Sequence, residues 1–109
     1  MQKINQGDIV FAPFPYSDLS DVKKRPLLVI SNNNDFEIII VKITSTLNMT
    51  NAISIKPLDV NFTILKPSVV KYKSISTIDK NIIIKKIGSV NKIFLEKIID
   101  KIKLEIDVF

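Results

Sequence analysis

Arg25 is the one arginine of the chain, and it stands at the junction between a polar stretch and an apolar run, in KKRPLLVIS. A guanidinium stays charged at physiological pH, and its planar fork can contact two phosphate oxygens at once, which a lysine ammonium cannot do. Arg25 is therefore a candidate for binding or stabilising a phosphate group. The alternative is a structural role, in which Arg25 pairs with Asp18 or Asp21 or binds loop carbonyls.

A run of hydroxyl side chains in KITST, residues 42–46, is the second candidate. Thr44 or Ser45 could form a hydrogen bond with a phosphate or with a ribose 2′-hydroxyl. Taken alone, these residues are better explained by ordinary turn chemistry at the end of a strand. If residues 27–31 and 36–44 form a hairpin, the start of the first strand lies beside the end of the second. Arg25 and Thr44 would then be neighbours.

Several other chemistries are excluded by composition. The chain has no histidine and no cysteine, so the commonest zinc sites, the Ser-His-Asp triad and the Cys-His pair cannot be built. Two glycines are too few for a glycine-rich phosphate loop. The acidic residues are scattered singly, which disfavours a magnesium cluster. We therefore expect no metal and no other cofactor.

The elements that must position these residues are mostly strands. Six segments show the β-branched or alternating apolar pattern of strands, namely residues 7–12, 27–31, 36–44, 52–58, 68–78 and 82–88. The prolines of residues 13–26 predict one long loop. In residues 68–78, strict alternation places Val69, Lys71, Lys73 and Ile75 on one face.

One segment has helical period. Asn91 is a candidate N-cap, and the apolar stripe that follows it consists of Phe94, Leu95, Ile98, Ile99, Ile102 and Ile106. Short strands followed by one amphipathic helix predict a mainly β (α+β) fold, a small curled sheet or barrel with the helix packed against it. A length of 109 residues predicts a single domain, residues 1–109.

The formal net charge of +5 is unevenly distributed. Residues 91–109 balance to zero, whereas residues 56–86 hold seven lysines against Asp59 and Asp79. Such a surplus attracts a polyanion, although a lysine-rich solvated surface is an equal alternative. No apolar run reaches the roughly 20 residues of a membrane span, and the N-terminus has no signal-peptide pattern. A cytoplasmic location is therefore expected.

The sequence resembles the MazF/PemK/Kid toxins of type II toxin-antitoxin systems along nearly its whole length. The resemblance rests on GDIVFAPFPYSDLSDVKKRPLLVIS, VKITS, PSVVKYKSISTIDKNIIIKKIG and the terminal helix. It implies an SH3-like barrel with a C-terminal helix, a homodimer, and metal-independent, sequence-selective cleavage of single-stranded mRNA. It also implies that Arg25 and Thr44 are the catalytic pair.

The expected reaction is attack of the RNA 2′-hydroxyl on the adjacent phosphate. Arg25 would stabilise the phosphorane charge and protonate the leaving 5′-oxygen, while Thr44 would orient the phosphate or the 2′-hydroxyl. Many relatives carry a basic residue where this chain has Ser76, so a second positive group is either missing or supplied by Lys71 or Lys73. The identity of the general base stays open. The expected RNA contacts are Lys23, Lys24, Ser45, Asp18, Lys71, Lys73 and Ser76.

The resemblance also implies a cognate acidic antitoxin that covers the basic site. The hydrophobic fraction of 46% in so small a body predicts leftover apolar surface, which agrees with a two-fold homodimer. Two other functions remain open. One is a CcdB-like toxin that binds DNA gyrase without nuclease activity, and the other is a non-catalytic SH3-like module that binds nucleic acid.

Overall fold

A computed structural model of the chain describes residues 3–15, 22–31, 33, 35–46 and 50–106. The strands in this part of the chain are β1 (Asp8–Pro15), β2 (Val22–Val29), β3 (Glu37–Thr44), β4 (Ala52–Ile55), β5 (Ser68–Asp79) and β6 (Lys85–Ser89). They are accompanied by the 3₁₀ turns η1 (Pro57–Asp59) and η2 (Lys80–Ile82) and by the helix α1 (Lys92–Glu105). The predicted fold class, mainly β with a C-terminal helix, is confirmed.

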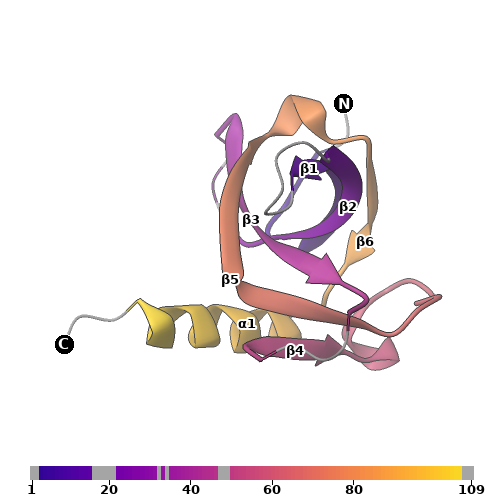
Figure 1. Cartoon of the computed structure of the whole chain (residues 1–109), viewed down its shortest axis with the longest axis vertical. Coiled ribbons are helices and arrows are strands. Elements are labelled where there is room, and N and C mark those ends of the chain that lie inside the picture. Colours follow the sequence, from indigo (N-terminus) through magenta and orange to yellow (C-terminus); the bar gives the residue numbers. More distant parts are fainter. Residues whose placement is uncertain (1–2, 16–21, 32, 34, 47–49, 107–109) are drawn as a thin grey trace.

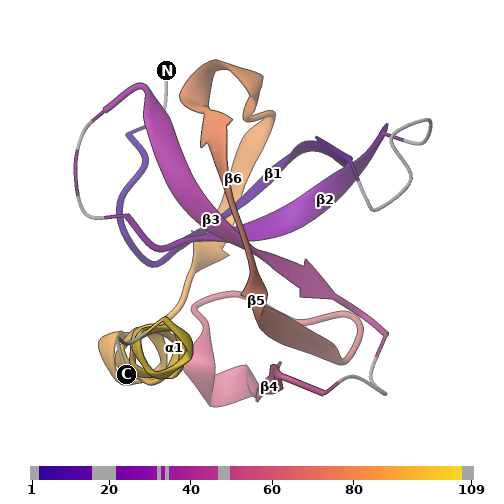
Figure 2. The same ribbon diagram turned by 60° about the vertical axis from the view of Figure 1, so that its left-hand side comes forward.

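The strands form one antiparallel sheet in the order β4-β5-β3-β2-β1-β6. Figure 1 shows that this sheet curls into a barrel-like ring. Both α1 and β4 lie at the lower end of the ring, which is clear when the molecule is turned (Figure 2). None of the helices in the described residues is long and apolar enough to cross a membrane.

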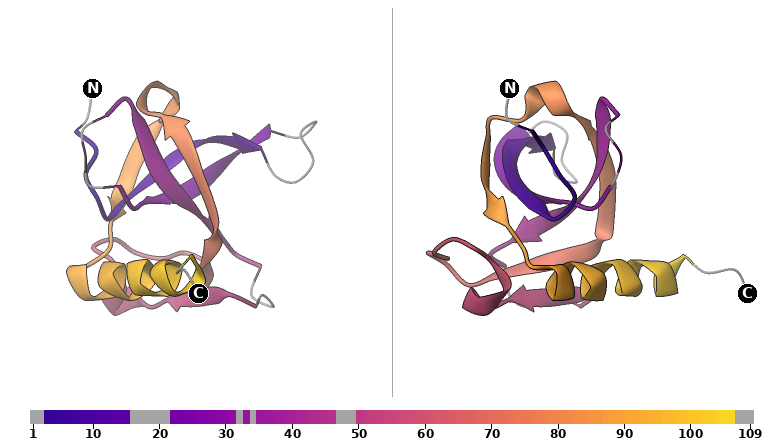
Figure 3. Two further views of the ribbon diagram at one scale, coloured as in Figure 1. Left: turned by 90° about the vertical axis from the view of Figure 1, so that its left-hand side faces the viewer. Right: turned by 180° about the vertical axis from the view of Figure 1, so that it is seen from behind.

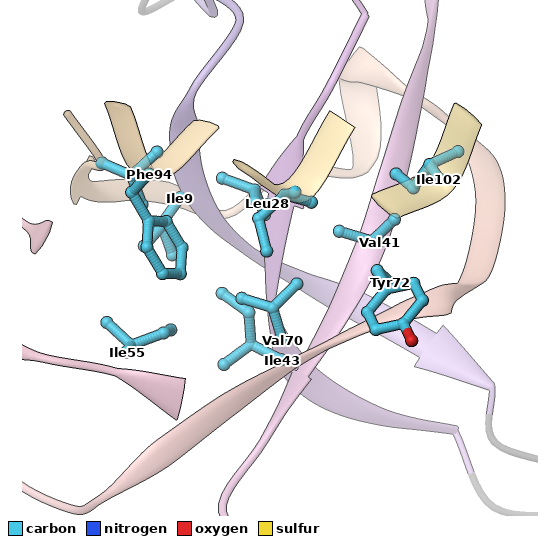
Figure 4. Close-up of a cluster of buried hydrophobic side chains, with 11 residues drawn as sticks. Ile9, Leu28, Val41, Ile43, Ile55, Val70, Tyr72, Phe94 and Ile102 are labelled. Carbon is cyan, nitrogen blue, oxygen red and sulfur yellow. The ribbon is translucent and has the colours of Figure 1, made fainter. Parts of the chain in front are cut away.

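The sheet buries apolar side chains on both of its faces, because neighbouring residues of a strand point to opposite sides. On the face toward α1 lies the helix cluster, made of Ile9, Leu28, Val41, Ile43, Ile55, Val70, Tyr72, Val90, Phe94, Ile98 and Ile102. Figure 4 shows Phe94 of α1 beside Ile9 of the sheet, and Ile102 of α1 above Val41 and Tyr72. The opposite face holds the barrel cluster, made of Ile4, Val10, Ala12, Leu27, Val29, Ile38, Ile40 and Ile78.

The long strand β5 contributes to both clusters because it contains a bulge. Val41 of β3 pairs with Ile75, but the next residue, Lys42, pairs with Lys71, so residues 72–74 have no partners on β3. Val41 and Lys42 point to opposite faces of the sheet, so their partners Ile75 and Lys71 do so too, although simple alternation along β5 would put them on the same face. The predicted common face for Lys71 and Ile75 is therefore wrong.

The predicted loop over residues 13–26 is also wrong in extent, since β1 continues to Pro15 and β2 begins at Val22. Both strands tolerate proline because each has an open edge there. The pairing of β6 with β1 reaches Phe11, before Pro13, and the pairing of β3 with β2 starts at Leu27, after Pro26. The missing proline N–H therefore falls where no ladder bond is made.

Two other strands are shorter at one end than predicted. The strand β4 stops at Ile55, because Pro57 opens η1, and β6 starts only at Lys85, because η2 occupies Lys80–Ile82. The turn η1 changes the direction of the chain after β4, and η2 changes it after β5. Figure 3 shows the resulting path from two further sides.

The helix α1 begins as the sequence predicts. The Asn91 side chain accepts a hydrogen bond of 2.8 Å from the Phe94 N–H, which satisfies one donor of the first turn. Phe94, Ile98 and Ile102 are buried against the sheet. Ile106 lies past the last helical residue and is 69% exposed, so the apolar stripe ends one turn earlier than predicted.

Candidate active-site cleft

A cleft opens where β2 and β3 part. The strand β2 pairs with β1 from Val22 to Leu28. It pairs with β3 over a shorter stretch, from Leu27 to Val29. Leu27 faces Lys42 in the last pair, and the first half of β2 then continues away from the end of β3. The space between them is a cleft of about 630 Å³.

Arg25 and Thr44 both line this cleft. Arg25 lies two residues before Leu27 and Thr44 two residues after Lys42, so the alternation of side chains puts them on one face of the sheet. Arg25 is half-buried opposite Ala12 of β1. The hairpin predicted from the sequence thus brings the two candidate residues to one site.

The Thr44 side chain is held in a defined position. It is 8% exposed, its residue pairs with Val69 of β5, and its hydroxyl oxygen accepts a bond of 3.2 Å from the Thr46 N–H. A hydroxyl has one donor and two acceptor lone pairs, so this bond leaves the hydroxyl proton for donation. A phosphate oxygen in the cleft is a suitable acceptor.

The cleft is cationic. Its lining includes the positive side chains Lys24, Arg25 and Lys66, and none of the described residues that line it is acidic. Hydroxyl groups from Ser45 and Ser68 add neutral donors. A concave surface with charge of one sign raises the local concentration of the opposite ion, so this cleft is suited to an anion.

Lys66 was missed in the sequence analysis. It precedes Pro67 at the entry to β5, and the Ser68 hydroxyl donates a 3.1 Å bond to the Lys66 carbonyl. The signal was present in the sequence, because a basic residue directly before a proline is also the context of Arg25. What the sequence could not give is the fold of residues 56–67, which brings Lys66 to the cleft.

Other predicted contacts lie elsewhere. Lys23 is exposed opposite Phe14, Lys71 pairs with Lys42, Lys73 forms a 3.2 Å ion pair with Glu105 of α1, and Ser76 pairs with Ile40. The cleft is not lined by Lys23, Lys71, Lys73 or Ser76. Asp18 lies outside the described residues. The positive side chains that line the cleft beside Arg25 are those of Lys24 and Lys66.

An apolar groove of about 440 Å³ adjoins the cleft. The two cavities share Phe11, Pro26, Ile43, Lys66 and Ser68, and the groove extends from these residues to the connection between β4 and β5. The described residues contain no group of three or more histidine, cysteine, aspartate or glutamate side chains that could hold a metal ion.

Comparison with protein families identifies the family of this chain. The family model for the PemK-like, MazF-like toxin of type II toxin-antitoxin systems matches residues 5–106. The chain belongs to this family. The resemblance drawn from the sequence is therefore confirmed.

Solved structures of this family share the fold. An endoribonuclease from a mycobacterial species, determined in complex with its cognate antitoxin, matches with a TM-score of 0.76 and 19% identity over 98% of this chain and 100% of its own. A second mycobacterial endoribonuclease gives a TM-score of 0.72 and 21% identity, covering 95% of this chain and 91% of that one. The Mycobacterium tuberculosis toxin MazF-mt6 gives 0.69 and 18%, over 93% and 99%. No curated protein matches the sequence significantly.

Proposed function

We propose that this PemK-like, MazF-like chain is an endoribonuclease toxin that cuts single-stranded mRNA in the cleft between β2 and β3. The observation that carries the proposal is the placement of Arg25 and Thr44 together in a cationic cleft. Family membership supports the toxin assignment. The structural relatives named above are described as endoribonucleases, which supports the same activity here.

The proposed reaction is a transesterification within the RNA. The 2′-oxygen forms a bond to phosphorus, and the bond from phosphorus to the 5′-oxygen breaks. The 2′-hydroxyl loses its proton and the leaving 5′-oxygen gains one, so the products are a 2′,3′-cyclic phosphate and a 5′-hydroxyl end. The attacking group belongs to the substrate, and this step therefore uses neither a water nucleophile nor a metal.

Arg25 and Thr44 are proposed to act on the phosphate. The guanidinium of Arg25 stabilises the charge that builds on the phosphorane and on the leaving 5′-oxygen, because its charge is fixed and its donors are planar. The Thr44 hydroxyl donates to a non-bridging oxygen and fixes the orientation of the phosphate. Lys24 and Ser45, which also line the cleft, contact neighbouring parts of the strand. For Lys23, Lys71, Lys73 and Ser76, contact with RNA stays a prediction.

The proposed partners follow from charge and exposed apolar surface. A cationic cleft favours a cognate antitoxin with an acidic segment, which would block the site by occupying it. Several large apolar side chains are exposed, such as Phe36 at 77% and Ile93 at 80%, and they would supply apolar contact area to the proposed homodimer. The proposed place of action is the cytoplasm. Static light scattering at micromolar concentration would test the homodimer by its mass.

The activity can be tested by incubating the purified protein with a long single-stranded RNA, with and without EDTA, and mapping the ends. We expect discrete cuts, identical in EDTA, with 2′,3′-cyclic phosphate and 5′-hydroxyl termini. Arg25→Ala should lower the rate about a hundredfold or more, since it removes a charged donor from the transition state. Lys97→Ala, which removes an exposed cation from α1, is the matched control and should cut normally.

Two outcomes would contradict the proposal. Cleavage by Arg25→Ala at the wild-type rate would remove Arg25 from the mechanism. Intact RNA with tight, salt-dependent binding would instead indicate a nucleic-acid-binding module, and inhibition of DNA gyrase by such a non-cutting protein would indicate the CcdB-like alternative.

A further inference from the structure

The apolar groove next to the cleft has a lining unlike that of the cleft itself. Its walls include Phe11 of β1 and Phe62, Ile64 and Leu65 of the connection between β4 and β5. Leu65 is 93% exposed, although it borders a space of about 440 Å³. An exposed large apolar side chain at the mouth of an apolar groove indicates a ligand with an apolar face.

Phe62 is held in the groove by the backbone of β6. A Cβ atom on Gly88 would lie 2.4 Å from Cδ1 of Phe62, so the ring can lie there only because residue 88 is glycine. The neighbouring Asn61 side chain accepts a 2.8 Å bond from the Ser89 N–H, and the Asn61 N–H donates a 3.1 Å bond to the Ser89 carbonyl. The aromatic wall of the groove is thus fixed before any ligand binds.

Phe11 forms a second aromatic wall, and it also lines the cleft. The ammonium group of Lys85 lies 5.9 Å from the centre of its ring, within the range of a cation–π contact. Lys66 and Ser68 stand where the groove and the cleft meet, because both residues line both cavities. The junction therefore carries a positive charge, and an aromatic group lies beside it.

We propose that the apolar groove binds one unpaired base of the RNA strand, and that Lys66 contacts the phosphate that links this nucleotide to the one being cut. The proposal rests on the proposed function, which places the scissile phosphate between Arg25 and Thr44. Single-stranded RNA offers alternating charged phosphates and flat apolar bases, and proteins bind it with cations beside aromatic side chains. The continuity of the cleft and the groove presents these two chemistries side by side.

The lining also predicts how selective this subsite is. Most residues of the groove are apolar, and the polar ones, Thr63, Lys66 and Ser68, lie on the connection or at its junction with β5. A subsite that holds a base by stacking and burial accepts all four bases, because every base has a π-face and the hydrogen-bonding groups on the base edge are not read. One position beside the cut should therefore tolerate all four bases while still requiring a base.

An abasic scan tests the subsite directly. The probe is a set of short fluorescent RNA oligonucleotides that carry a 2′-deoxyribose at the mapped cut position, which prevents cleavage, and one abasic site at each position in turn. We expect one abasic position beside the cut to weaken binding roughly tenfold. Replacement of that base by any of the other three should change binding by less than about twofold.

Matched variants then assign the position to the groove. Leu65→Ala should weaken binding of the complete oligonucleotide and reduce the effect of the abasic site. Leu58→Ala is the control, because Leu58 is 91% exposed on the same connection and lines neither cavity. Phe62→Ala should act more strongly than Leu65→Ala, and Leu65→Ala keeps the test valid if Phe62→Ala fails to fold.

Lys66 has an equally close control. Lys66→Ala should lower the slope of log binding constant against log salt by about one, whereas Lys56→Ala, another exposed lysine directly before a proline, should leave it unchanged. Equal slopes for the two variants would remove Lys66 from the RNA contact.

The subsite and the activity can fail independently. If the protein cuts RNA but no abasic position weakens binding, or if Leu65→Ala matches Leu58→Ala, the base subsite is refuted and the ribonuclease stands. If the protein binds RNA but does not cut it, the abasic scan is run on an unmodified oligonucleotide that the protein binds, and the comparison of Leu65→Ala with Leu58→Ala still decides the subsite. If Leu65→Ala spares RNA binding but abolishes binding of an acidic peptide with apolar residues, the groove is a peptide site and the proposal is overturned.

Discussion

Leu27 of β2 and Lys42 of β3 form the last pair between their strands. The two catalytic candidates lie two residues past this pair at the same end of the ladder, one on each strand. The pair fixes Arg25 and Thr44 on one face, because side chains two residues apart on a strand point the same way. The strands then separate, which makes room for a substrate. A fixed register beside an open gap is a simple way to position a phosphate-binding pair.

Two replacements of Thr44 distinguish the role of its hydroxyl group from that of its size and shape. Thr44→Val keeps the size of the side chain and removes the proposed donor, so we expect the cleavage rate to fall about a hundredfold. Thr44→Ser keeps the hydroxyl and should retain most of the activity. The Val variant should also lose about 1 kcal/mol of stability, since the Thr46 N–H loses its acceptor. Single-turnover rates and thermal melts of both variants measure these effects; equal rates for the two would exclude the hydroxyl from the reaction.

The packing of α1 on the sheet should be a main source of stability. Ile98 is completely buried in the helix cluster, so Ile98→Ala should lower the free energy of unfolding by about 2 to 5 kcal/mol. Ile93 is 80% exposed on the same helix, and Ile93→Ala should change it by less than about 0.5 kcal/mol. Urea unfolding compares the two. A similar loss in both would mean that Ile93 is covered in solution, as by a second subunit.

Asn91 joins the start of α1 to η1. Its side-chain oxygen accepts from the Phe94 N–H at 2.8 Å, and its amide nitrogen donates to the Leu58 carbonyl at 3.0 Å. Asn91→Ala should cost about 1 kcal/mol through the lost cap. Asn91→Asp keeps the acceptor at the positive end of the helix and removes only the donor, so it should recover most of that loss. If Asp is as damaging as Ala, the bond to Leu58 is the more important one.

The contact between Gly88 and Phe62 should appear as an energetic coupling. Gly88→Ala introduces a Cβ atom 2.4 Å from the Phe62 ring and 2.7 Å from the Asn61 amide oxygen, so one of the segments must move. We expect the variant to be destabilised, and less so when Phe62→Ala is also present. A double-mutant cycle should give a coupling of about 0.5 to 3 kcal/mol. Strict additivity would show that the strain falls on Asn61.

The secondary structure was largely readable from local patterns. Alternation of apolar residues located the strands, and Asn91 with the spacing of Phe94, Ile98 and Ile102 located the helix. The hairpin between β2 and β3 also followed from its two apolar runs, and with it the meeting of Arg25 and Thr44. These features depend on residues close together in the sequence, whose physical preferences act directly.

The features that were missed depend on distant contacts. The place of Lys66 follows from the anchoring of residues 59–61, where Val60 pairs with Val90 and the Asn91 N–H donates to the Asp59 carbonyl. The prolines of β1 and β2 are accepted because neighbouring strands happen to end beside them. No local propensity encodes where a neighbouring strand stops, so a proline-rich strand reads as a loop.

The unpaired residues of the β5 bulge have a consequence for how the gene can tolerate changes in length. The face of each β5 side chain is set by its partner on β3, so Val70 opposite Ile43 and Ile78 opposite Ile38 keep their sides for as long as both runs of pairs persist. Removing one codon for residue 73 or 74 would shorten only the unpaired segment, whereas removing one codon among residues 75–79 would shift the register of that run by one position. Viable length variants of β5 should therefore fall within the bulge.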